Sequence, residues 1–315
     1  MQKIIKTPGP AGSEFPEDTP TEGIEKKLRR RYNRNKKDQT EGSERMVIDF
    51  HTHTFPDKIA APTIHTLEKR SGLTAASDGT QKGLTASMEK AGVTIGVVLP
   101  VITKPEQFAT INTYARKITP ESFDGEGLKL LSFGAVHPYS PSYREELREI
   151  RSMGLKGIKI HPDYLGIMID DPKMLCLLDE ASNQGLVISI HAGIDIGLPA
   201  KVHCPPQRSA AVLRAVRPEK CVLAHMGGFR QWDQVEELLM GQNVYLDTSM
   251  TNGFMDQAQM KRLIKGHGAK QILFGTDSPW GDQGKDISYI KELGLTEEEE
   301  EAVLWKNAAG LLELA

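Results

Sequence analysis

Cysteine is scarce in this sequence of 315 residues, and its pattern excludes several kinds of site. Only Cys176, Cys204 and Cys221 are present, and no two of them form a Cys-x-x-Cys pair. A disulfide framework or a cysteine-rich zinc site is therefore not expected, and a reducing, cytoplasmic location is predicted. Cys176 and Cys221 occur in apolar runs and are predicted to be core residues, whereas Cys204 precedes two prolines and is predicted to lie in an exposed loop.

Aromatic side chains and net charge are also low. Aromatics make up 6% of the sequence and the formal net charge is -3, so neither base stacking nor attraction to phosphate favours a nucleic-acid partner. A membrane partner is not expected either, because no apolar stretch approaches the roughly 20 residues that a spanning helix needs. The expected partner is a small-molecule substrate, and a homodimer is compatible with the sequence.

The first 45 residues differ from the rest of the chain. They contain four prolines, a basic run at 26–31 and few large apolar residues. Such a composition cannot bury enough apolar surface to form a core, so residues 1–45 are predicted to be a disordered extension with one short basic helix around 24–31. Residues 46–315 are predicted to fold as one domain.

Strands and helices alternate from Met46 onward, as in an α/β protein with parallel strands. The predicted strands are mostly apolar and β-branched, and they lie at 46–50, 94–99, 128–136, 157–160, 186–190, 221–224, 244–246 and 271–274. The predicted helices include 84–90, 143–152, 172–183 and 255–265, and Thr296 with Glu299 forms a capping box before the last helix. Eight such units predict a (β/α)8 TIM barrel. A doubly wound open sheet is the alternative, although it usually has fewer strands and a glycine-rich first turn.

Histidines occur at the ends of the predicted strands. A pair ends the first strand, single histidines end the fourth, fifth and sixth strands, and an aspartate follows the eighth: His51 and His53, His161, His191, His225 and Asp277. The carboxyl ends of all strands open onto one face of a barrel, where its active site lies. Nitrogen and oxygen donors that converge there are suited to a zinc-like divalent ion. The set therefore predicts a metal centre.

The pair on the first strand can reach one ion together. Residues two apart on a strand point to the same side, so His51 and His53 share a face. Asp49 lies on that face one layer below, where it is either an orienting partner of a ligand or a buried structural carboxylate. His137 ends the third strand and is predicted to be structural. No role is predicted for the histidines in loops and helices, which are His65, His203 and His267.

These motifs resemble those of the amidohydrolase superfamily, and most closely its amidohydrolase-related branch, which includes aminocarboxymuconate semialdehyde decarboxylase-like proteins. The resemblance covers residues 46–315 and rests on the order and spacing of five segments, at 48–53, 157–162, 190–193, 223–228 and 274–280. It implies one divalent metal ion, expected to be zinc, bound by His51, His53, His191 and Asp277. His225 then has an acid/base or electrostatic role.

Two other families share part of the pattern. The opening from Asp49 to His53 is similar to PHP phosphoesterases, whose last motif usually ends in Asp-x-His, unlike the segment that begins at Asp277. That last segment is also similar to TatD-type nucleases, which place a bridging glutamate at an earlier strand. Here Lys159 and His161 stand at the fourth strand. Lys159 either bridges a second metal ion as a carbamate or makes a structural or substrate-carboxylate contact, so the number of metal ions stays open.

The expected reaction is hydrolysis of a small-molecule ester, lactone or amide through a metal-activated water. Asp277 would move the proton, while His225 and His161 would polarise the substrate or stabilise the developing oxyanion. Non-oxidative decarboxylation of an unsaturated or aromatic carboxylate is the alternative, and a catalytically silent metal-binding barrel is a third. The loop at 54–81 is predicted to be a lid or a small helical insertion, and Trp280 and Asp282 are either substrate contacts or loop filler.

Overall fold

The computed structural model describes residues 46–120 and 127–314. The extension predicted for residues 1–45, with its basic helix, lies outside these residues. All eight predicted strands are confirmed: β1 (Ile48–Thr52), β2 (Ile95–Val98), β3 (Lys129–Ser132), β4 (Gly157–Ile160), β5 (Val187–Ile190), β6 (Cys221–Leu223), β7 (Tyr245–Asp247) and β8 (Ile272–Leu273). β3 ends four residues earlier than predicted. Backbone pairing continues only as far as an isolated bridge at Gly134, and the Ala135 N–H then donates to the Asn112 side chain at 3.0 Å.

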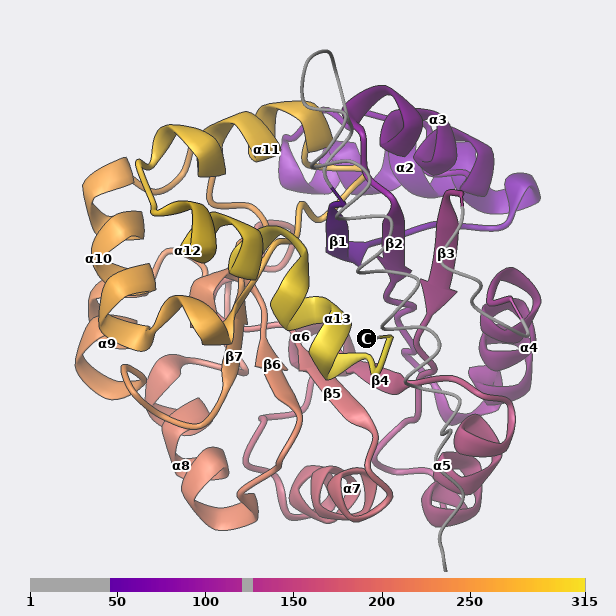
Figure 1. Ribbon diagram of the computed structural model, residues 1–315. Coiled ribbons are helices and arrows are strands. Elements are labelled where there is room, and N and C mark those ends of the chain that lie inside the picture. The colour runs from indigo at the N-terminus through magenta and orange to yellow at the C-terminus, as the bar shows by residue number, and fades with distance from the viewer. Residues whose placement is uncertain (1–45, 121–126, 315) are drawn as a thin grey trace, which may run out of the picture.

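The strands are parallel and close into a barrel (Figure 1). They pair in the order β1-β2-β3 and β4-β5-β6-β7-β8. A bridge from Gly134 to Ile158 joins β3 to β4, and the Phe50 N–H donates to the Phe274 carbonyl at 2.8 Å, which joins β1 to β8. The predicted TIM barrel is therefore confirmed, and the open sheet is excluded because the first and last strands are neighbours.

Helices surround the strands in Figure 1, as expected for this fold. The α-helices are α2 (Asp57–Ser71), α3 (Gln81–Ala91), α4 (Phe108–Ile118), α5 (Tyr143–Ser152), α6 (Pro162–Leu165), α7 (Pro172–Asn183), α8 (Pro206–Val216), α9 (Trp232–Leu238), α10 (Gln257–His267), α11 (Gln283–Glu292), α12 (Glu297–Glu301) and α13 (Asn307–Leu311). Shorter elements are the 3-10 turns η1 (Pro105–Gln107), η2 (His225–Gly227) and η3 (Ala269–Gln271), and a π-helical turn, η4 (Ala302–Lys306).

The predicted helices are present, and side-chain caps set their starts. α5 and α7 have the predicted bounds. α3 begins three residues before the predicted Leu84 because Thr80 accepts from the Gly83 N–H, and α10 begins two residues late because Asp256 accepts from the Gln259 N–H. The capping box of Thr296 and Glu299 opens α12 as predicted.

The C-terminal helix closes one end of the barrel. Its apolar side chains form one cluster with residues that start the strands: Ala308, Ala309, Leu311 and Leu312 with Ile48, Phe50, Val187 and Val222. Glu313 accepts from Lys220, just before β6, at 2.5 Å. This end carries the amino ends of the strands, and Figure 1 shows α13 across it. The opposite end, where the strands finish, is therefore the open one.

The segment after β1 forms a helical insertion, as predicted. α2 buries only Ala60 and Ile64 and ends at Gly72, which adopts a left-handed φ of 72°. Its last turn lines the cavity at the carboxyl end of the barrel. The helix thus contributes little to the core and stands at the mouth of the barrel.

Two of the three cysteine predictions are wrong. Cys221 is buried as expected, but Cys176 is exposed and Cys204 is buried. α7 buries Met174, Leu177 and Leu178, so Cys176 falls on the outer face of that helix. The Cys204 Sγ atom contacts the Ser209 Oγ atom at 3.3 Å under the start of α8.

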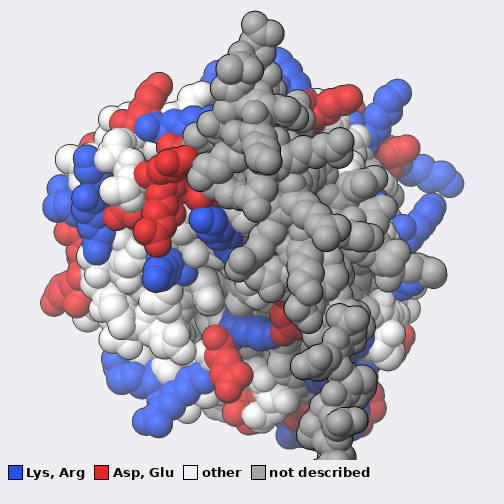
Figure 2. All heavy atoms as spheres, viewed as in Figure 1, with Lys and Arg blue, Asp and Glu red and all other residues white. Residues whose placement is uncertain are grey.

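Two surface properties agree with the bulk composition. None of the helices in residues 46–120 and 127–314 is long and apolar enough to cross a membrane. Figure 2 shows basic and acidic side chains interspersed over the described part of the face that carries α13, with no extended patch of one sign.

Candidate metal centre

Three predicted ligands converge at the carboxyl end of the barrel. The Nε2 atoms of His51 and His53 lie 3.2 Å apart, and the Asp277 Oδ1 atom lies 3.3 Å from the first and 2.9 Å from the second. Ligands that surround a zinc ion tetrahedrally at about 2.0–2.2 Å lie about 3.3–3.6 Å from each other. The donor types and spacing of these three atoms therefore fit one divalent ion.

Backbone contacts hold the segment that carries Asp277 against β1. The Asp277 N–H donates to the His51 carbonyl at 2.8 Å, and the His53 N–H donates to the Ser278 carbonyl at 2.6 Å. Gly275 allows this close approach, since a Cβ there would lie 2.9 Å from the His51 Cβ atom. Asp277 has a φ of 63°, a region that non-glycine residues rarely adopt and that often marks functional sites.

A carboxylate and a hydroxyl from the end of β7 support His51. Asp247 Oδ2 lies 2.9 Å from the His51 Nδ1 atom, and Ser249 Oγ lies 3.0 Å from the same atom. Asp247 and Ser249 are fully buried. Neither residue was predicted from the sequence, although an aspartate at the end of the seventh strand is a signal of the same kind as the strand-end histidines.

Electrostatics keep the imidazole neutral and the carboxylates charged. Burial, together with the charge of Lys159, lowers the pKa of His51 to about 4. Burial alone would raise the pKa of Asp277, but the interaction with the adjacent His51 imidazole and a hydrogen bond from His53 outweigh it and hold that pKa below its usual range. A neutral imidazole and an ionised carboxylate are the forms that bind a metal ion.

Lys159 is part of this centre. Its Nζ atom lies 3.2 Å from the His51 Nε2 atom, and the residue is 1% exposed. Burial lowers the pKa of Lys159 to about 8, although Asp247 and Asp277 raise it. An amine with this pKa loses its proton more readily than an ordinary lysine.

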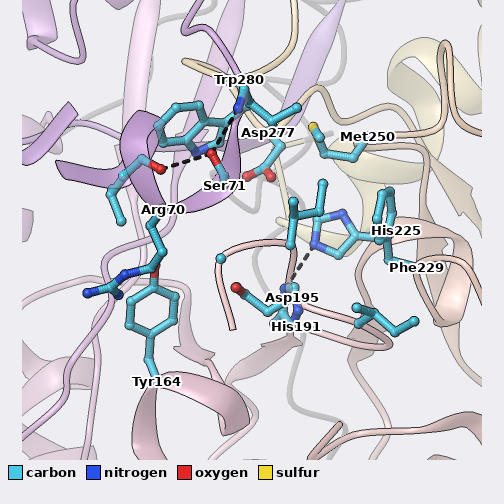
Figure 3. Close-up of a pocket in the computed structure, with 15 residues that line it drawn as sticks. Arg70, Ser71, Tyr164, His191, Asp195, His225, Phe229, Met250, Asp277 and Trp280 are labelled. Carbon is cyan, nitrogen blue, oxygen red and sulfur yellow. Dashed lines mark hydrogen bonds between the residues drawn. The ribbon is translucent and has the colours of Figure 1, made fainter. Parts of the chain in front are cut away.

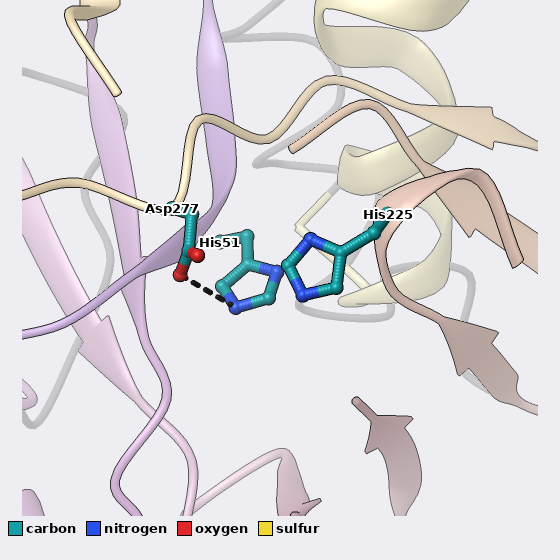
Figure 4. Close-up of side chains that lie close together, drawn as sticks. All are labelled: His51, His225 and Asp277. Atoms are coloured by element: carbon teal, nitrogen blue, oxygen red, sulfur yellow. Dashed lines mark ion pairs between the residues drawn. The ribbon is translucent and has the colours of Figure 1, made fainter. Parts of the chain in front are cut away.

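His225 lies beside the three convergent residues. Its ring centroid is 5.2 Å from that of His51, and Figure 4 shows His51 of β1 facing His225 and Asp277, which come from the segments after β6 and β8. His225, His51 and Asp277 also offer ligand atoms within 4.8 Å of one another. His225 has a φ of 58°, so the second candidate catalytic residue also carries backbone strain.

The fourth predicted ligand, His191, makes its contacts with the other histidines. Its Nδ1 atom lies 3.0 Å from the His225 Nε2 atom, and its ring stacks on His161 at a centroid distance of 4.1 Å. His161 in turn lies 3.4 Å from Asp195, from Nε2 to Oδ2. His161, His191 and Asp195 form a second group of potential ligands. Asp195 was missed because it lies in the loop after β5, where the pattern of strand ends does not reach.

Of the two roles considered for Asp49, its contacts support that of a buried structural carboxylate. Its carboxylate accepts from the backbone N–H of His51 and Thr276, from the Thr276 hydroxyl at 2.6 Å and from the Gln283 amide at 2.8 Å. It contacts no imidazole nitrogen among the residues that the structure describes. Burial raises the pKa of Asp49 to about 7, against the effect of these hydrogen bonds.

A cavity of about 250 Å³ opens over the centre. His51, His53, Lys159, His161, His191, His225 and Asp277 all line it. An adjoining pocket brings in Arg70 and Ser71 from α2, and Figure 3 shows Arg70 beside Tyr164, with His225 and Phe229 on the other side. Trp280 lines both spaces, whereas Asp282 caps α11 by accepting from the Lys285 N–H.

The structure resembles solved TIM-barrel proteins along most of its length. A 5-carboxyvanillate decarboxylase from Sphingomonas paucimobilis has a TM-score of 0.62 and 16% identity, over 86% of this chain and 99% of that one. A 2,6-dihydroxybenzoate decarboxylase from Rhizobium has a TM-score of 0.59 and 15% identity, over 85% and 98%. A putative 2-pyrone-4,6-dicarboxylic acid hydrolase from Pseudomonas putida has a TM-score of 0.58 and 16% identity, over 85% and 97%. At these identities the likeness supports the fold.

Sequence comparison identifies the family. A search of curated proteins finds no match. The family model described as Amidohydrolase, in contrast, matches residues 48–314, which includes every strand and the whole metal centre. The chain therefore belongs to the amidohydrolase family, in its metal-dependent branch of TIM-barrel proteins.

Proposed function

We propose that this protein is a metal-dependent hydrolase that cleaves a small ester, lactone or amide. The observation that carries the proposal is the position of Asp277. Its ionised carboxylate lies within 3.3 Å of both imidazoles of the first strand, at the floor of the cavity. When bound there, a divalent ion supplies the Lewis acidity that makes water a nucleophile near neutral pH. Asp277 is then placed to take the proton of that water.

The remaining histidines are placed to act on the substrate. His225 and His161 both line the cavity; His161 stacks on a face of the His191 ring, and His225 meets the Nδ1 edge of that ring. We assign His225 to protonate the leaving group or stabilise the developing oxyanion, and His161 to polarise the substrate. His51, His53 and Asp277 are the proposed ligands of one ion, expected to be zinc, with His191 as the fourth.

The charges around the cavity favour a substrate that carries a carboxylate. Lys159 lies at its floor and Arg70 at its mouth. The guanidinium group of Arg70 hydrogen-bonds to the Tyr164 side chain but forms no ion pair with a carboxylate of residues 46–120 or 127–314, so its positive charge can attract a substrate anion. A planar guanidinium group binds carboxylates with two parallel hydrogen bonds. A cavity of about 250 Å³ limits the substrate to a small molecule.

Non-oxidative decarboxylation of an unsaturated or aromatic acid is the second candidate. Two of the similar structures are titled as decarboxylases, and one is titled as a putative hydrolase. The same centre would orient a carboxylate, and the Lys159 ammonium group, with a pKa of about 8, would donate a proton to carbon. This reaction would release carbon dioxide, whereas hydrolysis incorporates oxygen from water.

One experiment distinguishes the two reactions. Protein loaded with zinc or manganese is incubated with small lactones, esters, amides and hydroxybenzoates, in water enriched in oxygen-18 and in deuterium oxide. Hydrolysis predicts oxygen-18 in the product acid and no carbon dioxide. Decarboxylation predicts carbon dioxide and deuterium on the product carbon. Turnover that gives carbon dioxide and a deuterated product overturns the hydrolase proposal. The absence of both turnover and metal binding overturns both candidate reactions.

A further inference from the structure

A buried carboxylate behind His191 has no role in the reaction described so far. Asp163 lies in α6, directly after the end of β4, and its side chain is fully buried. Its Oδ1 atom accepts from the backbone N–H of His203 at 3.2 Å and lies 2.9 Å from the His203 Nδ1 atom. His203, to which the sequence analysis gave no role, thus holds one oxygen of Asp163 with two donors.

The other oxygen of Asp163 faces His191. The Asp163 Oδ2 atom lies 3.8 Å from the His191 Nε2 atom. Both atoms are buried, and neither has a hydrogen-bond partner among the residues that the structure describes. Leaving two buried polar atoms unpaired costs free energy, and a movement of less than 1 Å would pair them. The two atoms are therefore arranged for an N–H···O hydrogen bond.

We infer that Asp163, held by His203, is a positioning residue that fixes the tautomer of His191. A carboxylate that faces the Nε2 atom requires the proton to be on that nitrogen, because a lone pair would be repelled. The neutral ring then presents its Nδ1 lone pair to the opposite side. That side is where His225 lies, with its Nε2 atom 3.0 Å from the His191 Nδ1 atom.

The consequence reaches the cavity through His225. With the lone pair of His191 on Nδ1, the His225 Nε2 atom has to be the donor in the contact between the two rings. The same lone pair is the one that His191 can offer to a metal ion, as a carboxylate behind a ligating histidine commonly ensures. The inference rests on the proposed function only in assigning a catalytic benefit to this tautomer. The tautomer itself follows from the contacts of Asp163.

The first test measures the tautomer in the wild-type protein. Nitrogen-15 spectra of the metal-free protein, labelled at histidine, report which ring nitrogen carries the proton, and His191→Gln identifies the His191 signals among the nine histidines. The expected result is His191 protonated at Nε2. A wild-type His191 protonated at Nδ1 overturns the inference, whether or not the protein proves to be a hydrolase.

The second test changes Asp163. In Asp163→Asn, the amide oxygen can still accept from His203, which turns the amide NH2 group toward the His191 Nε2 atom. We expect the proton of His191 to move to Nδ1, and kcat to fall by roughly 10–100-fold with little change in Tm. A smaller change in the same direction is expected in His203→Gln. The matched control is His267→Gln, which removes another buried imidazole. His267 hydrogen-bonds to the Val244 carbonyl and does not line the cavity.

The outcomes separate positioning from a structural role. An unchanged His191 tautomer in Asp163→Asn overturns the inference, even if activity falls. A loss of activity that His267→Gln reproduces also overturns it, since it would reflect general destabilisation. A shifted tautomer in a protein that shows no hydrolase activity supports the positioning role and counts against the proposed function alone.

Discussion

Asp247 and His51 lie 196 residues apart in the sequence and meet at 2.9 Å, between the Asp247 Oδ2 and His51 Nδ1 atoms. Both side chains are fully buried. A proton on Nδ1 is shared with the carboxylate, so the Nε2 lone pair points toward His53 and Asp277. The position of the metal centre therefore depends on a contact between the first strand and the seventh.

This contact predicts the effect of Asp247→Asn. The Asp247 Oδ1 atom already accepts from the backbone N–H of His225 and Ser249, so an asparagine would keep its oxygen there and turn its NH2 group toward His51. The His51 tautomer should invert, and metal affinity should fall by roughly 10–100-fold. Competition titration with a chromogenic chelator measures the affinity.

Asp49→Asn is the control for that variant. Asp49 is equally buried and accepts four hydrogen bonds, from the backbone N–H of His51 and Thr276, the Thr276 hydroxyl and the Gln283 amide. We expect it to lower the free energy of unfolding by about 1–3 kcal/mol and to leave metal affinity unchanged. Equal losses of metal affinity in both variants would contradict a specific role for Asp247.

Much of the barrel could be predicted from local sequence. The strands are short apolar runs, and the starts of the helices carry recognisable caps such as Thr296, so each element is specified by neighbouring residues. The convergence of His51, His53 and Asp277 also follows from the strand ends once a barrel is assumed. This is why fold, family and three adjacent donors agree with the structure.

The partners of those donors could not be predicted in the same way. Asp247, Asp163 and Asp195 act through contacts with side chains on other strands, and nothing in their neighbouring residues specifies such a contact. Cys176 shows the same limit within one helix, because an apolar run does not reveal which residue falls on the outer face of α7. Side-chain environment is decided by tertiary packing.

Arg70 should determine the affinity for anionic substrates. It lines the pocket from the last turn of α2, beside Tyr164 (Figure 3). Arg70→Leu removes a charge-assisted hydrogen bond worth about 1.5–3 kcal/mol, so KM for a carboxylate-bearing substrate should rise roughly 10–100-fold with little change in kcat. Steady-state kinetics on the best substrate of the panel measure both constants.

Lys69→Leu is the matched control for Arg70. Lys69 is the neighbouring exposed cation in the same turn and does not line the pocket. The KM of Lys69→Leu for the carboxylate-bearing substrate should stay near the wild-type value. If both variants raise KM equally, the effect is a general loss of positive charge, and Arg70 makes no direct contact with substrate.

A half-buried carboxylate outside the metal centre predicts a pH effect on stability. Burial raises the pKa of Asp286 from 3.8 to about 6, although Asn252 donates to its Oδ1 atom at 2.9 Å. The folded state therefore binds more protons than the unfolded state between these two pH values, and the free energy of unfolding falls as pH rises through them. Above pH 6 the ionised group costs at most about 3 kcal/mol.

Asp286→Asn removes this titration. As pH rises from 4 to 7, the free energy of unfolding of the variant minus that of the wild type should increase by up to about 3 kcal/mol. The asparagine stays neutral throughout, whereas Asp286 ionises. Urea unfolding of both metal-free proteins at several pH values measures the difference. A difference that does not depend on pH would show that Asp286 titrates alike in the folded and unfolded states.

The last prediction separates metal ligands from the acid/base residue. His51→Ala removes the nitrogen of a proposed ligand whose partner, His53, lies 3.2 Å away, so the protein should lose its metal ion. His225→Asn should keep the ion while kcat falls by roughly 100-fold or more, as loss of a general acid/base or oxyanion group does. Asp277→Asn should show both losses, because Asp277 is assigned to hold the ion and to move the proton.

His137→Gln provides the control for these three variants. His137 lies in the segment after β3 and is buried, but its Nδ1 atom accepts from the Tyr139 N–H at 3.1 Å and it does not line the cavity. Its metal content and kcat should match the wild type. Metal content by elemental analysis and turnover are measured on all four variants.

His225 offers a ligand atom within 4.8 Å of His51 and Asp277. If His225→Asn loses metal as completely as His51→Ala, then His225 is a ligand and the acid/base role belongs to another residue.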